Sequence, residues 1–320
     1  MSNGSYQFFD LKPAMGSMRS EVIAGLQQSN KQISPKYFYN ESGSELFEEI
    51  TRLPEYYLTR TEIALFEAHS AAIAEHLEQG GCLVEYGSGS SLKIRKLLET
   101  VQPEAYVPVD ISGDHLQSNA RALQADYPWL SLYPVCTDFT AAFALPAPVR
   151  GLSKTGFFPG SSIGNFEPAA AVQLLTNICA TLGSGSHLLL GVDRKKDAAQ
   201  LEAAYDDAAG VTAAFNLNML THLNTTLGAD FDISKFRHRA SYNQDLGCVQ
   251  MFLTSTCAQQ VAIGDVVIEF AQDEAIHTEN SFKYLPEEFA ELAGRAGFEQ
   301  AAFWTDEQDW YSVFLLRVPG

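Results

Sequence analysis

Val84-Glu-Tyr-Gly-Ser-Gly89 reads as the end of a buried strand followed by a glycine loop, and this stretch decides the fold. A loop of this kind needs glycine because its backbone turns sharply and carries no side chain where it passes close to a ligand. Residues 91–100 then predict a helix whose first N–H groups point into the same crevice. The stretch therefore predicts a strand, loop and helix of an α/β fold, with a ligand site at the turn.

Two acidic residues follow at the ends of the next two predicted strands. Asp110 ends the run 105–110, where a carboxylate accepts hydrogen bonds from ribose hydroxyls in doubly wound folds. Asp138 and Phe139 follow the next run, and we expect them to hold an adenine by its exocyclic amine and its ring face. The glycine loop and the two acids together predict a nucleoside cofactor.

The spacing of the loop narrows the choice of cofactor. A dinucleotide fingerprint requires a third glycine three residues after Gly89, and position 92 is Leu. Glu85, two residues before Gly87, instead fits a loop that holds S-adenosyl-L-methionine, whose sulfonium and amino groups are cationic. The alternative is an ordinary strand, turn and helix without a ligand, which the positions of the two acids disfavour.

Strand-like and helix-like runs alternate from residue 82 to about residue 195. Strands separated by helix-length spacers predict a parallel sheet with crossover helices. A helix over 286–296 and a hairpin of the runs 301–304 and 310–317 are expected to complete this sheet. The remaining predicted strands are 82–86, 105–110, 131–136, 154–159 and 186–192, and the helices are 60–77, 91–100, 113–125 and 167–182.

The rest of the chain follows a different pattern, which predicts a second domain. The first 33 residues are polar with few signals of order, apart from a short helix over 15–27, and 45–51 has helical spacing. The insertion reads as helices over 197–225 and antiparallel strands over 235–283, including 248–257 and 261–270. We therefore expect one domain of residues 61–195 plus 286–320 and another of 1–60 plus 196–285.

Composition excludes several classes of partner. The formal net charge of -18 at pH 7 argues against nucleic acid, because such affinity comes largely from Lys and Arg. No run of eighteen apolar residues and no signal peptide occurs, so we expect no membrane association. Five cysteines without a Cys-x-x-Cys pair predict reduced thiols and a cytoplasmic protein, and the seven scattered histidines predict no metal site. A monomer that binds a small molecule is the expectation.

Three motifs carry a resemblance to a known family. They are SPKYFYNESGSELFEEITRLPEYYLTRTE (34–62), FPGSSIGNF (158–166) and IHTENS (276–281). In this order, over nearly the whole chain, the sequence resembles the S-adenosylmethionine-dependent L-histidine N-alpha-methyltransferases of ergothioneine biosynthesis. The resemblance implies a Rossmann-like class I methyltransferase domain with a second α+β substrate-binding domain formed by the N-terminal segment and the insertion. It also implies trimethylation of the α-amino group of L-histidine to hercynine.

The family's site residues carry over to matching positions. Its amino-acid contacts fall on Tyr56, Asn165 and Tyr205, and its imidazole contacts on Glu279 and Ser281. Tyr39, Gly160 and Met251 match positions that line the substrate pocket, and Asn165 with Tyr39 would position the amine, with no dedicated base assigned. The cofactor contacts fall on Gly87, Lys93, Asp110, Asp138 and Phe139.

The residue types suit this chemistry, although each has a structural alternative. An amide such as Asn165 can accept from an amine without titrating, and two polar partners for an imidazole reject an apolar side chain. Alternatively, Glu279 and Ser281 form a solvent-facing pair, the tyrosines are core rings, Met251 only packs, and Lys93 lies on a helix surface. Tyr86 and Asn280 depart from the family pattern. Two other functions stay open, an N-methyltransferase of another aromatic amino acid or amine such as tryptophan, and a non-catalytic amino-acid or S-adenosylmethionine sensor.

Overall fold

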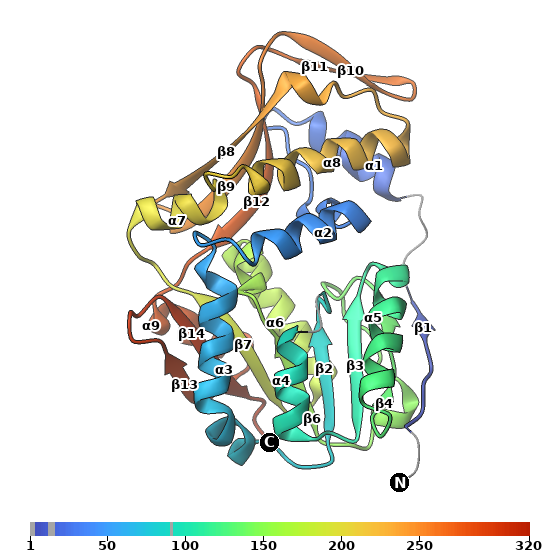
Figure 1. Cartoon of the computed structure of the whole chain (residues 1–320), viewed down its shortest axis with the longest axis vertical. Coiled ribbons are helices and arrows are strands. Elements are labelled where there is room, and N and C mark those ends of the chain that lie inside the picture. Colours follow the sequence, from blue (N-terminus) through green and yellow to red (C-terminus); the bar gives the residue numbers. More distant parts are fainter. Residues whose placement is uncertain (1–3, 12–16, 90–91) are drawn as a thin grey trace. The chain divides into compact units, whose positions relative to one another are not determined.

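The computed structural model describes residues 4–11, 17–89 and 92–320, which form two compact units (Figure 1). Unit 1 contains the described residues of Met1–Pro13, Leu58–Lys195 and Lys283–Gly320. Unit 2 contains the described residues of Ala14–Tyr57 and Lys196–Phe282. We expected the first residues of the chain to lie in the second unit, but they add a strand to the sheet of unit 1.

The sheet of unit 1 is parallel except at one edge. Its order is β1-β5-β3-β2-β6-β7-β14-β13, with β4 paired to β3, and only the pairs β7–β14 and β14–β13 run antiparallel among those described. This arrangement confirms the predicted α/β class with a parallel sheet that a C-terminal hairpin completes. The strands are β1 (Phe9–Asp10), β2 (Cys82–Tyr86), β3 (Ala105–Asp110), β4 (Ser131–Leu132), β5 (Val135–Cys136), β6 (Lys154–Phe158), β7 (His187–Asp193), β13 (Glu299–Thr305) and β14 (Tyr311–Arg317).

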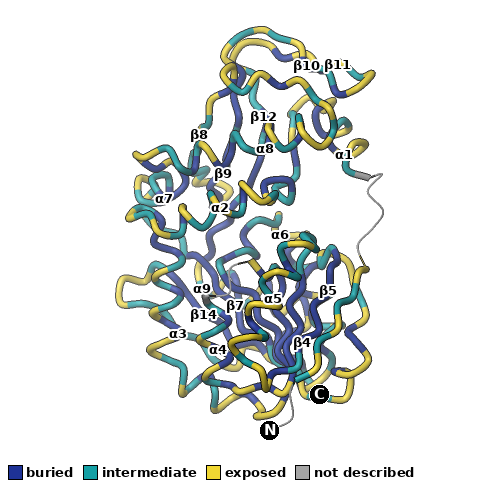
Figure 2. Tube along the Cα trace, turned by 45° about the vertical axis from the view of Figure 1, so that its right-hand side comes forward, coloured by how far each residue is buried: buried dark blue, intermediate teal, exposed yellow. Residues whose placement is uncertain are grey.

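Burial explains why this sheet could be read from the sequence. Every residue of β2 is buried, and the strands at the centre of the sheet form the dark blue interior of Figure 2. Strands covered on both faces need continuous apolar runs, which is the pattern of this segment. The elements around the sheet are α3 (Tyr57–His76), α4 (Leu92–Val101), α5 (Gly113–Asp126), η2 (Ala147–Val149), η3 (Ser162–Asn165), α6 (Pro168–Leu182) and α9 (Pro286–Arg295).

Two expectations for unit 1 were wrong. The predicted strand 131–136 is interrupted between β4 and β5, where Pro134 has no N–H to donate to a neighbouring strand. The N-terminal segment is not without order, because β1 pairs in parallel with β5, and Gly4 and Gln7 also donate backbone hydrogen bonds. A strand of two residues is too short to show a period of two in the sequence.

Unit 2 combines helices with antiparallel strands. Its main sheet has the order β12-β9-β8, and β10 and β11 form a separate hairpin. The strands are β8 (Phe236–Asn243), β9 (Cys248–Ser255), β10 (Gln259–Ile263), β11 (Val266–Phe270) and β12 (Ala275–Phe282). The helices are α1 (Ser17–Leu26), η1 (Pro35–Phe38), α2 (Glu41–Ile50), α7 (Ala198–Tyr205), α8 (Val211–Leu227) and η4 (Ile233–Lys235).

Local chemistry sets the ends of these elements. The helix predicted over 45–51 begins at Glu41, because the Asn40 side chain accepts the Gly43 N–H at 2.8 Å as an N-cap. The predicted strand 261–270 is wrong, since Gly264, with a φ of +63°, turns the chain into the β10–β11 hairpin. Of the helix predicted over 15–27, positions 15 and 16 lie outside the described residues, and α1 covers the rest except Gln27.

Candidate functional site

The glycine loop of unit 1 folds over the end of β3. Gly87 follows β2 directly with a φ of +73°, a conformation that side chains other than glycine rarely adopt. The N–H groups of Gly87 and Ser88 donate to the carbonyl of Val109 at 2.9 and 3.0 Å. A Cβ on Gly87 would lie 3.7 Å from the ring of Phe139, so the loop and this aromatic side chain are neighbours. Two of the predicted cofactor residues thus lie side by side.

Glu85 lies beneath the glycine loop in the interior of unit 1. Its side chain is buried and accepts a hydrogen bond from the Tyr106 hydroxyl, which in turn lies 3.2 Å from Ser88 Oγ. Burial raises the pKa of Glu85 to about 7, against the opposing effect of these hydrogen bonds. The carboxyl group therefore supports the glycine loop from the interior of the unit, and its role toward the cationic groups of the cofactor stays a prediction.

The two acids lie at the carboxyl ends of neighbouring strands. Asp110 ends β3, its Oδ1 accepts the Ser112 N–H at 2.8 Å, and burial raises its pKa to about 6. Asp138 follows β5, and its Oδ1 accepts from the N–H and the hydroxyl of Thr140 at 3.0 and 2.6 Å. Since β5, β3 and β2 are adjacent and parallel, these side chains share one edge of the sheet with the glycine loop. Acceptors for ribose hydroxyls and an aromatic face fit an adenosyl group.

Tyr86, a departure from the family pattern, packs beneath this edge. Its ring meets those of Phe139, Phe143 and Phe158 edge-on at centroid distances of 6.1, 6.4 and 6.4 Å. Gly156 lies next to this ring, and a Cβ there would come within 2.8 and 2.9 Å of the side chains of Leu188 and Leu182. Tyr86 thus packs within an aromatic cluster, and this cluster also contacts Phe139, the residue proposed to bind adenine.

The strand order reverses between β2 and β6, the switch point at which doubly wound sheets bind ligands. The loop after β6 begins with Gly160 at a φ of +81° and ends in η3, whose last residue is the half-buried Asn165. The Gly160 N–H donates to both carboxylate oxygens of Glu62, at 2.9 and 3.0 Å. Lys93 Nζ lies 2.5 Å from the same carboxylate with its side chain 14% exposed, so the surface reading of Lys93 was wrong.

A cluster of aromatic and hydroxyl side chains lies in unit 2. The Tyr205 hydroxyl is 2.7 Å from Ser281 Oγ, and the Tyr205 ring meets Tyr56 edge-on at 6.2 Å. Tyr56 also contacts Phe47, whose ring meets the more exposed Tyr39 at 5.9 Å. The structure therefore brings Tyr56, Tyr205 and Ser281 together, with Tyr39 one ring further on.

A bulge in β12 determines which side chains share a face. The register with β9 shifts between His277 and Glu279, and the hydroxyl of the intervening Thr278 donates to the carbonyl of Met251 at 3.1 Å. His277 and Asn280, three residues apart, therefore meet on one face with a 2.9 Å hydrogen bond.

The other face of β12 after the bulge carries Glu279 and Ser281. They are 8% and 3% exposed, and Glu279 lies opposite the buried Met251. The reading of this pair as solvent-facing was wrong, because a carboxylate and a hydroxyl are buried side by side. A carboxylate accepts a hydrogen bond and a hydroxyl donates or accepts one, so the two residue types complement the two ring nitrogens of an imidazole.

Sequence reasoning missed two buried residues that support the predicted site. One is Glu62. The other is His238, whose Nε2 lies 2.8 Å from the Tyr205 carbonyl and whose Nδ1 lies 2.8 Å from Asn216 Nδ2. Burial lowers the pKa of His238, so the neutral ring donates from Nε2 and fixes the end of α7. Glu62 ends the first family motif, but nothing in the sequence indicates its partners or those of His238, because each acts through a contact that only the fold creates.

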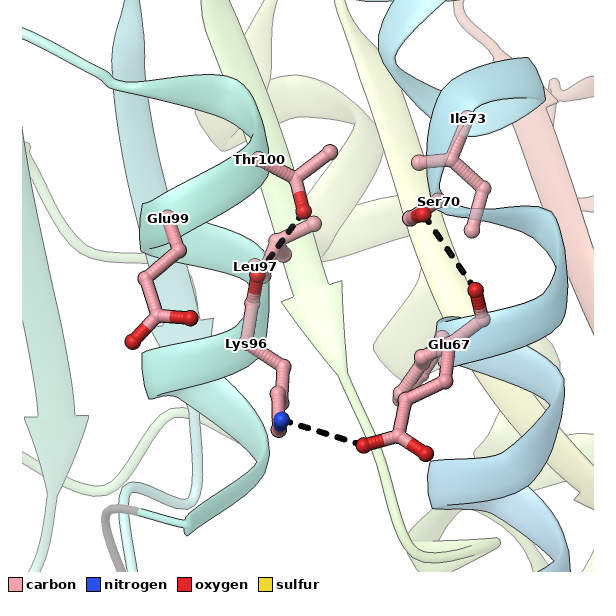
Figure 3. Close-up of a pocket in the computed structure, with 8 residues that line it drawn as sticks. Glu67, Ser70, Ile73, Lys96, Leu97, Glu99 and Thr100 are labelled. Atoms are coloured by element: carbon pink, nitrogen blue, oxygen red, sulfur yellow. Dashed lines mark hydrogen bonds and ion pairs between the residues drawn. The ribbon is translucent and has the colours of Figure 1, made fainter.

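A cavity of about 320 Å³ between α3 and α4 lies apart from these residues (Figure 3). The Lys96 ammonium and the Glu67 carboxylate, 3.1 Å apart, form an ion pair across it, and no predicted site residue lines it.

The described residues, 4–11, 17–89 and 92–320, contain no group of three or more His, Cys, Asp or Glu that could hold a metal. The five cysteines are free thiols. No helix in the described part of the chain is long and apolar enough to cross a membrane.

The switch-point loop, the two acids and the parallel sheet with its antiparallel hairpin define a class I S-adenosylmethionine-dependent methyltransferase. The chain belongs to the family of S-adenosylmethionine-dependent, histidine-specific methyltransferases, whose model matches residues 18–318. It is therefore an enzyme that uses S-adenosylmethionine, and the reading as a non-catalytic sensor is set aside.

Two similar proteins illustrate this membership, and one solved structure shares the fold. The histidine N-alpha-methyltransferase of Mycolicibacterium smegmatis is 41% identical over 309 residues, which cover 94% of this chain and 95% of the relative. Ergothioneine biosynthesis protein 1 of Neurospora crassa is 31% identical over 94% of this chain and 35% of its own length. The solved structure of the PH0226 protein from Pyrococcus horikoshii OT3 has the same fold, with a TM-score of 0.50 and 13% identity over 88% of this chain and 100% of that one.

Proposed function

We propose that the chain transfers three methyl groups from S-adenosylmethionine to the α-amino nitrogen of L-histidine and so forms hercynine, a step of ergothioneine biosynthesis. The observation that carries this proposal is the buried pair Glu279 and Ser281 on one face of β12, with Tyr205 hydrogen-bonded to Ser281. A buried carboxylate and a buried hydroxyl on one face of a strand discriminate in favour of a ligand with matching polar groups, because an apolar ligand would displace their hydrogen bonds without replacing them. The names of the relatives support the same substrate.

The imidazole end of the substrate is assigned to β12. The Glu279 carboxylate accepts the N–H of one ring nitrogen, and the Ser281 hydroxyl serves the other by donating or accepting. Tyr205, through its 2.7 Å contact, fixes the rotation of the Ser281 hydroxyl. Met251, opposite Glu279, limits the width of the pocket and so favours an imidazole over an indole.

The amino-acid end is assigned to the hydroxyls of Tyr56 and Tyr205 and to the amide of Asn165. The tyrosines bind the carboxylate, and Asn165 accepts a hydrogen bond from the amine so that its lone pair has a fixed direction. Tyr39 assists in positioning the amine, and Gly160 contributes backbone only, since its N–H is occupied by Glu62. The amine must be neutral before each transfer, and water or a tyrosine relay removes its proton, because no side chain is assigned as a dedicated base.

The cofactor is assigned to unit 1, which makes this unit the methyltransferase domain and unit 2 the substrate-binding domain. Asp110 accepts from the ribose hydroxyls, Asp138 and Phe139 hold the adenine, and Gly87 allows the backbone to approach the ligand. Lys93 lies in the first turn of α4, and its ammonium pairs with Glu62 next to Gly160. When bound, S-adenosylmethionine supplies an electrophilic methyl group on a sulfonium. We place the enzyme in the cytoplasm as a monomer.

Locating the methyl groups tests the proposal. The purified protein is incubated with L-histidine and S-adenosylmethionine, and the products are analysed by proton NMR and fragmentation mass spectrometry. We expect a nine-proton singlet from a trimethylated α-nitrogen and an unmodified imidazole. Methylation of a ring nitrogen, or conversion of tryptophan or another aromatic amine instead of histidine, would contradict it.

A further inference from the structure

The carboxylate of Glu62 joins three separate parts of unit 1. Glu62 lies on α3 and is fully buried. Its Oε1 accepts from the Gly160 N–H at 2.9 Å and from the Tyr311 hydroxyl at 2.9 Å. Its Oε2 accepts from the Gly160 N–H at 3.0 Å and lies 2.5 Å from Lys93 Nζ. One buried side chain thus connects the loop after β6, the first turn of α4 and the strand β14.

The space for this carboxylate is built into the sheet. A Cβ on Gly191 of β7 would lie 1.9 Å from Glu62 Oε1 and 2.2 Å from the Tyr311 hydroxyl. No side chain other than hydrogen fits at this position while Glu62 keeps its place. The neighbouring strand leaves space for this buried carboxylate, and three donors satisfy its hydrogen bonds. The carboxylate is therefore held in one position.

The partners of Glu62 are residues that the proposed function uses. Gly160 begins the loop that ends at Asn165, and its Cα lies so near Lys93 that an added Cβ would be 3.4 Å from Nζ. The next residue, Ser161, is also left-handed, with a φ of +58°, and its Oγ accepts the Asp193 N–H at 2.9 Å. Glycine adopts this conformation freely, but serine rarely does, so the hydrogen bonds that Gly160 makes with Glu62 and Ser161 makes with Asp193 help to hold the loop in this shape.

We propose that Glu62 is a positioning residue for methyl transfer, which sets the Gly160–Asn165 loop and the Lys93 ammonium in their working arrangement. This inference rests on the proposed function, in which Asn165 orients the amine and Lys93 belongs to the cofactor side. Glu62 itself acts through these residues. Its loss changes the reaction because a displacement of about 1 Å in an aligning group costs up to about a hundredfold in rate.

The test separates positioning from stability with a matched control. Glu62→Gln keeps the size of the side chain but removes the charge that pairs with Lys93, and Glu62→Asp keeps the charge but withdraws it by one methylene. Tyr311→Phe is the control, because it removes one hydrogen bond from the same carboxylate and leaves the contacts with Gly160 and Lys93. For each variant we measure the melting temperature, the kcat and KM for both substrates, and S-adenosylmethionine affinity by calorimetry.

All three variants are expected to melt at a lower temperature than the wild type. At a temperature where each is folded, Glu62→Gln is expected to lower kcat roughly ten- to a hundredfold and to weaken S-adenosylmethionine binding about tenfold. Glu62→Asp shows a smaller loss, and Tyr311→Phe stays within about twofold of the wild type in both measurements. Wild-type kinetics in either folded Glu62 variant, or an equal defect in Tyr311→Phe, overturns the inference.

The wild-type enzyme, assayed beside the variants, shows which proposal has failed. If it methylates histidine while the Glu62 variants match it, only the role of Glu62 is wrong. If it leaves histidine unmethylated, the proposed function is wrong, and calorimetry with S-adenosylmethionine alone still decides whether Glu62 positions Lys93. Unchanged affinity in Glu62→Gln then rejects that role as well.

Discussion

The buried carboxyl of Glu85 makes a quantitative prediction about stability and pH. Its pKa is raised from 4.5 to about 7 because burial disfavours the charged form. Between these two pH values the folded protein binds a proton that the unfolded chain does not, so the free energy of unfolding falls as pH rises through this window. Each pH unit in this window lowers the free energy of unfolding by about 1.4 kcal/mol. The contribution of Glu85 to the free energy of unfolding is therefore about 3 kcal/mol smaller at pH 8 than at pH 4.

Glu85→Gln isolates this effect. The amide has nearly the same shape, and its oxygen still accepts from the Tyr106 hydroxyl, but it does not titrate. Urea unfolding of both proteins at several pH values between 4 and 8 gives the difference in free energy of unfolding, in which the titration of Asp110 and other groups cancels. We expect the variant to gain about 3 kcal/mol relative to the wild type over the full window. Parallel pH profiles for the two proteins would refute the reasoning.

Two further predictions concern the proposed site. Glu279→Ala should lower kcat/KM for histidine by an amount equivalent to about 2 to 4 kcal/mol, because a buried imidazole N–H loses a charged acceptor. Asn280→Ala, on the opposite face of β12, is the control, and its kcat/KM should stay within about threefold of the wild type. Equal losses in the two variants would reject the assignment. S-adenosylmethionine affinity, measured by calorimetry, should rise about tenfold from pH 5 to 7, since burial raises the pKa of Asp110 from 3.8 to about 6 and the ionised carboxylate accepts more strongly from ribose hydroxyls. Asp110→Asn should bind more weakly and without this dependence, and a pH-dependent Asp110→Asn would show that another group is responsible.

The parallel sheet could be predicted from the sequence because burial on both faces leaves unbroken apolar runs such as β2. The β10–β11 hairpin could not, since Gly264 and Asp265 interrupt the run 261–270 too briefly to separate two strands from one. The strand β1 exists through its pairing with β5, and two residues carry no periodic signal. The sequence hides a two-residue turn in the first case and a pairing between distant segments in the second.

The same distinction applies to the site. Gly87 and Asp110 stand at strand ends, which the pattern locates, and the motifs of the family locate Glu279 and Ser281. Glu62 lies within the first motif, but its partners Gly160 and Tyr311 are 98 and 249 residues away along the chain. No spacing rule connects them, because only the packing of α3 against the sheet brings them together.

The central claim is tested most directly by mass spectrometry of L-histidine incubated with the protein and S-adenosylmethionine, beside tryptophan, tyrosine and phenylalanine. The proposed function predicts mass gains of one, two and three methyl groups on histidine alone, with the trimethylated product accumulating. Gains on another amino acid would contradict the assignment of Glu279 and Ser281, and no gain on any of them would contradict the proposed reaction.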